Sequence, residues 1–145
     1  MTDRSDFTFF HPLRVRWAEC DAQGIVFNVN YFLYFDVGMT EYMRELGVKF
    51  TGEDAFEFFT VHAEADYRGS AVFDDMIDIG VRCARIGNKS MAIACAIFRG
   101  DELLTEGRLT YAHAERGTKN TTPLPQKFID QLLAFEKNPP EMKRA

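Results

Sequence analysis

The stretch from Trp17 to Gly47 carries a carboxylate in an unusual place. Asp21 ends the acidic triplet Glu19-Cys20-Asp21, and a long, almost wholly apolar segment begins a few residues later. A carboxylate can attack an electrophile directly, or it can take a proton from water. An unneutralised carboxylate just upstream of a buried helix is costly unless it is used. We therefore interpret this stretch as the active site, although a lone aspartate at a turn is more often a turn or capping residue.

The side chains around Asp21 have simpler explanations. Cys20 has no histidine nearby in sequence to activate it, so we interpret it as a small buried residue rather than a nucleophile. Glu19 is expected to be solvated or ion-paired at the end of a strand. The three histidines lie on different expected strands without metal-ligand spacing: His11, His62 and His113. The sequence therefore indicates no metal site.

A helix from about Tyr31 to Leu46 must position this carboxylate. Apolar residues recur along it every three or four positions, and its first two turns are apolar nearly all round, so we expect it to be buried on most sides. Asn28 or Asn30 can cap its N-terminus, and Gly47 stands where a C′ glycine belongs. Gly38 interrupts the helix and indicates that another backbone approaches closely.

Strands are expected on both sides of this helix. The hydrophobic period changes from helical to alternating after the helix. The expected strands cover residues 7–17, 59–68, 75–85, 90–98 and 103–113. In the fourth of these, alanines alternate with larger apolar residues, which favours a central strand with its alanine face under a helix. A C-terminal helix is expected over residues 126–137.

This order of elements indicates an α+β fold, in which a curved five-stranded antiparallel sheet wraps one long central helix. The chain has 145 residues, the length of one domain, which we expect over residues 1–137 with a flexible tail at 138–145. The core is small, and a single chain leaves one side of this sheet-and-helix arrangement uncovered. Both features favour a homo-oligomer, either a homodimer or a tetramer.

The composition argues against several classes of function. The net charge is -5, whereas nucleic-acid binding needs a dominant basic surface. No apolar run approaches the roughly 20 residues that span a bilayer, and the N-terminus has no signal-peptide core, so no membrane partner is expected. The three cysteines are odd in number and lack CxxC spacing, which favours the cytoplasm over an oxidising compartment.

Three motifs resemble those of one enzyme family. They are W-x-x-C-D-x-x-G-I-V-x-x-x-N-Y from Trp17 to Tyr31, A-V-F-D-D-M-I-D-I from Ala71 to Ile79, and the pair Lys89-Ser90. The first is specific, and the other two follow in the right order. In these motifs the chain resembles the hotdog-fold thioesterases of the 4-hydroxybenzoyl-CoA thioesterase family over about residues 9–113. The resemblance implies a hotdog fold and hydrolysis of acyl-CoA without a metal or cofactor, since coenzyme A is part of the substrate.

The resemblance also implies roles for single residues. Asp21 matches the catalytic carboxylate, as nucleophile or general base. Asn28 matches the residue whose backbone N–H polarises the thioester carbonyl, and Gly24 matches the glycine that lets the loop pack tightly. Related hotdog enzymes place a carboxylate on the helix instead, which keeps Glu41 as a lesser candidate. Lys89 matches a position in the basic cluster that holds the nucleotide.

The substrate would need a dry slot and a basic patch. Aromatic side chains near Asp21 could line the slot, namely Trp17, Phe27, Tyr31 and Phe35. We expect the phosphates of coenzyme A to be held by Arg68, Arg85, Lys89 and Ser90, whereas the simpler explanation of the basic residues is ordinary surface charge.

Three other functions compete with acyl-CoA hydrolysis. An acyl-acyl carrier protein thioesterase would need the same groups. A hotdog hydratase would need a histidine beside Asp21, and none lies between residues 12 and 61. A non-catalytic acyl-binding dimer would bind the ligand without releasing thiol.

Overall fold

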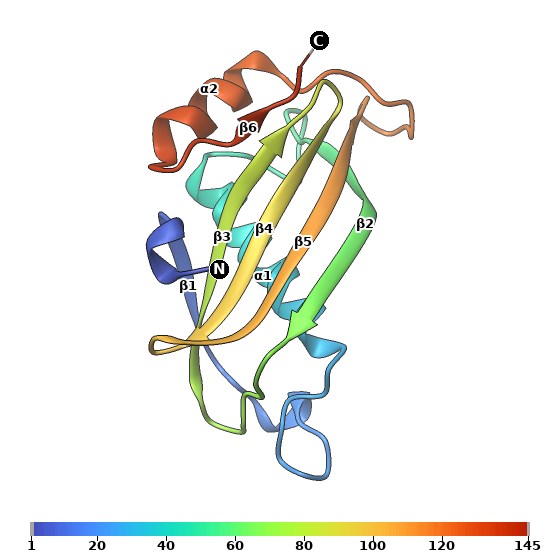
Figure 1. Cartoon of the computed structure of the whole chain (residues 1–145). Coiled ribbons are helices and arrows are strands. Elements are labelled where there is room, and N and C mark those ends of the chain that lie inside the picture. Colours follow the sequence, from blue (N-terminus) through green and yellow to red (C-terminus); the bar gives the residue numbers. More distant parts are fainter. Residues whose placement is uncertain (1, 145) are drawn as a thin grey trace.

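A single curved sheet organises the computed structural model, which describes residues 2–144 (Figure 1). Five antiparallel strands follow the spatial order β1-β3-β4-β5-β2, and β6 pairs in parallel with β3. The strands are β1 (Phe9–Arg14), β2 (Glu57–Tyr67), β3 (Met76–Ile86), β4 (Ser90–Arg99), β5 (Glu102–Ala114) and β6 (Glu141–Met142). The expected α+β class and the central antiparallel strands are confirmed.

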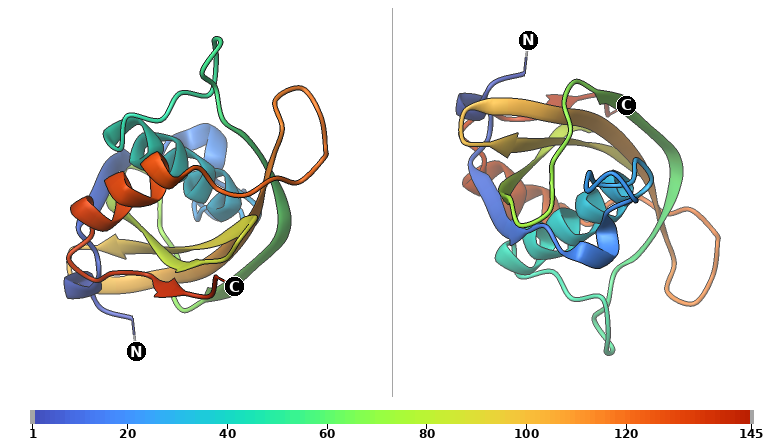
Figure 2. Two further views of the ribbon diagram at one scale, coloured as in Figure 1. Left: turned by 90° about the horizontal axis from the view of Figure 1, so that it is seen from above. Right: turned by 90° about the horizontal axis from the view of Figure 1, so that it is seen from below.

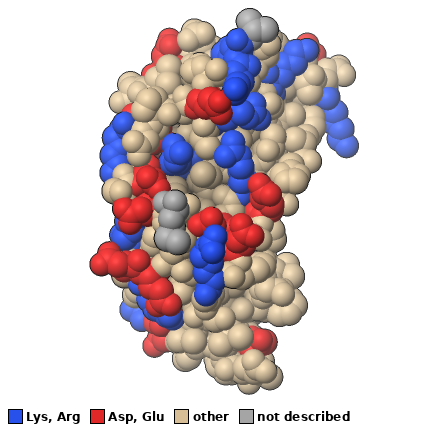
Figure 3. All heavy atoms as spheres, in the orientation of Figure 1, with Lys and Arg blue, Asp and Glu red and all other residues tan. Residues whose placement is uncertain are grey.

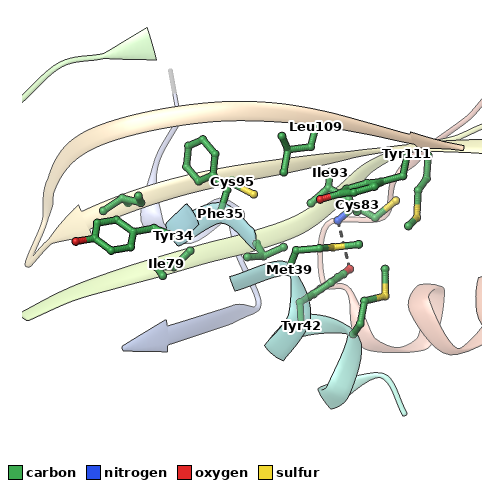
Figure 4. Packing of buried hydrophobic residues seen from close by; sticks show 14 of the residues in the cluster. Tyr34, Phe35, Met39, Tyr42, Ile79, Cys83, Ile93, Cys95, Leu109 and Tyr111 are labelled. Carbon is green, nitrogen blue, oxygen red and sulfur yellow. Dashed lines mark hydrogen bonds between the residues drawn. The ribbon is translucent and has the colours of Figure 1, made fainter. Parts of the chain in front are cut away.

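The long helix α1 (Asn30–Glu45) lies in the concave side of this sheet (Figure 2). Phe35, Met39 and Tyr42 from its buried face lie among residues of β3, β4 and β5 (Figure 4). At Gly38 an added Cβ would come within 2.5 Å of the Ile79 Cγ2 atom, so only glycine lets α1 approach β3 this closely. The sheet wrapped around one helix is the hotdog arrangement.

The alanine face of β4 is covered differently from our expectation. The larger residues of β4, such as Ile93 and Cys95, face the core that contains α1. Ala96 faces the opposite side and packs with Phe7, which precedes β1. The prediction that the alanine face lies under a helix is wrong, because the larger apolar side chains fill the helix side, while Ala96 on the other face packs with the N-terminal segment.

The ends of the predicted elements also shift. The first strand stops at Arg14, and residues Trp17–Glu19 form a short 3-10 helix, η2, instead of continuing it. Neither asparagine caps α1 with its side chain: the N-cap residue is Val29, and Asn30 Nδ2 donates to the Glu19 carbonyl at 2.8 Å instead.

The C-terminal residues pack against the sheet rather than forming a separate tail. The helix α2 (Gln126–Phe135) contributes Phe128, Ile129 and Leu132 to the main core. Beyond it Pro140 is buried, and β6 pairs with β3 at Arg85. The predicted boundary at residue 137 therefore does not mark the end of the ordered contacts, since β6 extends the sheet beside β3.

Candidate active site

A tight turn presents the Asp21 carboxylate. The Asp21 N–H donates to the Ile25 carbonyl at 2.9 Å, and the Gly24 N–H donates to the Asp21 carbonyl at 3.0 Å. Asp21 Oδ1 accepts from the Gln23 N–H at 2.8 Å. The second oxygen, Oδ2, has no hydrogen-bond partner within residues 2–144, and the residue is half-buried. One carboxylate oxygen is thus fixed by the turn and the other is available for chemistry.

Gly24 is required by its backbone conformation. Its φ is 78°, in the left-handed region that favours glycine, and an added Cβ would meet nothing within 4 Å. In the single chain no neighbour crowds Gly24, so the left-handed conformation of the turn is the observed reason for a glycine here.

The start of α1 offers N–H groups to the space beyond it. The Phe27 carbonyl accepts from the Asn30 N–H at 2.8 Å, so it points into the helix. In a trans peptide the C=O and N–H point in opposite directions, so the Asn28 N–H points away from the helix. In the part of the chain that the structure describes, this N–H has no acceptor. The helix dipole adds partial positive charge at the same place.

Glu19 ties this helix start to the Asp21 turn. Its side chain is only 6% exposed and accepts from the Arg16 N–H at 2.8 Å, from the Arg16 guanidinium and from the Tyr34 hydroxyl at 3.0 Å. Burial alone would raise the pKa of Glu19, but the bonds from Arg16 and Tyr34 outweigh it, and the pKa lies below its usual value. The Glu19 carbonyl also accepts from the Phe27 N–H at 3.0 Å. The predicted ion pair is present, but the side chain is buried.

The loop before β3 supports the Asp21 turn from the other side. The Ala71 carbonyl accepts from the Val26 N–H at 2.9 Å, and the Phe73 N–H donates to the Gly24 carbonyl at 3.0 Å. Asp75 holds this loop together, since it accepts from the Val72 N–H at 2.9 Å and from Arg99 at 2.7 Å. These contacts show what the Ala71–Ile79 motif does in the structure: it supports the Asp21 turn. The sequence alone showed only that the motif resembles one in a known family.

The four predicted slot residues do not gather in one pocket of the single chain. Tyr31 and Phe35 are buried in the core, and the Tyr31 hydroxyl accepts from the Ala71 N–H at 2.9 Å. Trp17 and Phe27 are 62% and 52% exposed. Tyr31 therefore supports the loop beside the Asp21 turn from within, Phe35 belongs to the core, and Trp17 and Phe27 lie on the surface.

The four predicted coenzyme A residues lie at two ends of the sheet. Arg68 follows β2 at the end that carries the Asp21 turn, and it pairs with Glu106 at 3.3 Å. Arg85, Lys89 and Ser90 lie at the opposite end, near α2 and β6 (Figure 1). Blue side chains gather at that end of the face drawn in Figure 3. A single chain therefore does not bring Lys89 to Asp21.

Known proteins share this combination of fold and segment order. Residues 23–106, more than half of the chain, match the family model of the thioesterase superfamily. The chain belongs to this superfamily. The matched part of the thioesterase contains Asn28, α1 and strands β2 to β4, and it begins two residues after Asp21.

Individual relatives resemble the thioesterase over most of their length. The protein named acyl-CoA thioesterase YbgC of Haemophilus influenzae is 24% identical over 127 residues, which are 84% of this chain and 92% of that protein. The crystal structure of the PA5185 protein of Pseudomonas aeruginosa is 29% identical, with a TM-score of 0.85 over 94% of this chain and 97% of that one. A Thermus thermophilus thioesterase complexed with coenzyme A and Zn is 22% identical, with a TM-score of 0.78 over 92% and 98%.

Residues 2–144 of the thioesterase contain neither a candidate metal site nor a candidate membrane-spanning helix. No group of three His, Cys, Asp or Glu side chains there is arranged to hold a metal ion. No helix in that range is long and apolar enough to cross a membrane.

Proposed function

We propose that this thioesterase hydrolyses acyl-CoA to a free acid and coenzyme A. Asp21 is the nucleophile or general base, and the Asn28 N–H stabilises the thioester oxygen. One observation carries the proposal: a carboxylate with a free oxygen lies on a turn whose neighbours anchor the start of α1, where an N–H points outward. The printed names of two relatives, an acyl-CoA thioesterase and a thioesterase complexed with coenzyme A, support the substrate class.

The chemistry needs only these groups and water. In the nucleophilic route, Asp21 attacks the thioester carbon, the C–S bond breaks, and coenzyme A leaves as a thiolate that takes a proton from solvent. Water then hydrolyses the mixed anhydride and restores the carboxylate. In the general-base route, Asp21 takes the proton of a water that attacks directly. In both routes the Asn28 N–H stabilises the negative oxygen, and no cofactor takes part.

A thiol-release assay tests the proposal. The purified protein is given short, long and aromatic acyl-CoAs, and Asp21→Asn is measured beside it. We expect release from at least one donor by the native chain and none by the variant, with the melting temperature unchanged because Asn keeps the Oδ1 acceptor. Release by the variant at most of the native rate contradicts the role of Asp21. Binding of acyl-CoA without any release favours the non-catalytic acyl-binding dimer.

Acyl-acyl carrier protein is the competing donor. Both donors carry the same thioester on a phosphopantetheine arm, so the same groups would act on both. A panel with one acyl group on the two carriers separates them. We expect the higher kcat/KM with the coenzyme A thioester.

We propose that the working form is a homodimer formed through β2, with a tetramer of such dimers as the alternative. β2 is the last strand of the sheet, and among the described strands it pairs only with β5. An unpaired edge of 11 residues is a template for another strand. Exposed Val61 on this strand and Leu33 on α1 add apolar surface. The three free thiols are compatible with the cytoplasmic location that we propose.

A further inference from the structure

A tyrosine from β2 reaches the peptide at the start of α1. The Tyr67 hydroxyl donates to the Asn28 carbonyl at 3.0 Å. Its ring packs edge-on against Tyr31, with 5.5 Å between the ring centroids. Tyr67 is 47% exposed in the single chain. Its hydroxyl thus reaches the start of α1 from the edge strand of the sheet.

The bond from Tyr67 acts on the peptide that contains the Val29 N–H. The Asn28 carbonyl also accepts from the Tyr31 N–H, but at the longer distance of 3.3 Å. Because the Asn28 carbonyl points into the helix, the Val29 N–H points outward, as the Asn28 N–H does. No acceptor for the Val29 N–H lies within residues 2–144. Two successive peptides thus present free N–H groups at the same helix end.

We propose that both N–H groups hold the thioester oxygen, and that Tyr67 is a positioning residue for the second one. The inference rests on the proposed function and adds a donor and its support to it. A hydrogen bond accepted by a carbonyl polarises its peptide and strengthens the attached N–H as a donor. The same bond fixes the rotation of the peptide, so the N–H needs no reorientation when negative charge develops on the oxygen.

The variant Tyr67→Phe removes only the hydroxyl and keeps the ring against Tyr31. We expect kcat to fall about threefold to tenfold, well short of the 10²–10³ seen when a whole oxyanion donor is lost. The melting temperature and the oligomeric state should stay unchanged, and KM should rise no more than about twofold to fivefold, because the lost bond matters most when the oxygen carries charge. An unchanged kcat would overturn the proposal.

Tyr42→Phe is the matched control at the far end of α1. The Tyr42 hydroxyl donates to buried Glu136 at 2.6 Å and accepts from the Cys83 N–H at 3.3 Å. Its loss should lower the melting temperature by roughly 3–10 °C and leave kcat of the folded protein unchanged. If both variants lose stability and neither loses kcat, Tyr67 has a structural role only and the inference fails.

Binding of two inert analogues isolates the carbonyl contact. One carries a ketone in which CH₂ replaces the sulfur, and the other is a thioether without a carbonyl. Tyr67→Phe should weaken binding of the ketone about twofold to fivefold and leave the thioether unaffected. Equal weakening of both analogues, or of neither, contradicts a role at the carbonyl. If the native chain releases no thiol, the proposed function fails on its own, and the ketone comparison still decides the role of Tyr67.

Discussion

At the scale of single residues, the two carboxylates near the start of α1, Asp21 and Glu19, differ in their surroundings and therefore in their roles. Within residues 2–144, Asp21 has one oxygen without a hydrogen-bond partner, whereas both oxygens of Glu19 accept hydrogen bonds in a buried position. Glu19 therefore serves to hold the site together. Its carbonyl anchors Phe27, and the Asn28 N–H lies in the next peptide.

Glu19 should make stability depend on pH in the acid range. Its pKa in the folded state lies below the ordinary value, so its contribution is present above that value, about 4.3, and is lost as the pH falls through the folded pKa. We expect the melting temperature of the native chain to approach that of Glu19→Gln as the pH falls from 6 to about 3. Thermal unfolding across this range checks the expectation, with exposed Glu45→Gln as the control. A constant difference between the two proteins would contradict it.

The sequence pointed to the residues that we propose as reactive, but not to the ones that hold them. Asp21, Gly24 and Asn28 fall within one continuous motif, so their spacing was visible. The contact of Glu19 with Tyr34 and that of Tyr67 with Asn28 join residues 15 and 39 positions apart. No local pattern marks such pairs, because they exist only after η2 and β2 have packed against α1.

At the scale of elements, hydrophobic periodicity placed α1 within one residue at each end, since Tyr31–Leu46 was expected and Asn30–Glu45 is observed. Periodicity alone could not say which face of β4 meets the helix, because both faces are apolar. The end of β1 at Arg14 was also missed, because the apolar alternation continues into η2 while the backbone turns.

Gly38→Ala tests the contact between α1 and β3. Alanine favours a helix by about 1 kcal/mol, but its Cβ would lie 2.5 Å from the Ile79 Cγ2 atom. Overpacking of this kind costs about 1–3 kcal/mol, so we expect a net loss of stability in urea unfolding. In the background of Ile79→Ala, which removes that atom, the same change should cost less or even stabilise. Equal costs in the two backgrounds would show that the contact does not matter.

At the scale of the whole molecule, the separation of Asp21 from Lys89 is the feature that no sequence pattern reveals. The resemblance placed both residues in one active site, but the segment between η2 and α1, which carries Asp21, and the turn between β3 and β4, which carries Lys89, lie at opposite ends of the sheet (Figure 1). Antiparallel pairing of β2 with a second copy about a two-fold axis reverses the partner sheet. It would therefore bring the Lys89 end of one chain beside the Asp21 end of the other.

Complementation between two inactive variants tests this composite site. In a heterodimer of Asp21→Asn and Lys89→Glu, one site carries both defects and the other carries none. If the two groups come from different chains, random pairing of equal amounts should restore about a quarter of the native sites. We expect activity at low acyl-CoA concentration to rise to that level after co-expression, above the mean of the separate variants. If each chain holds its own complete site, every site keeps one defect, and the activity of the mixture stays at that mean.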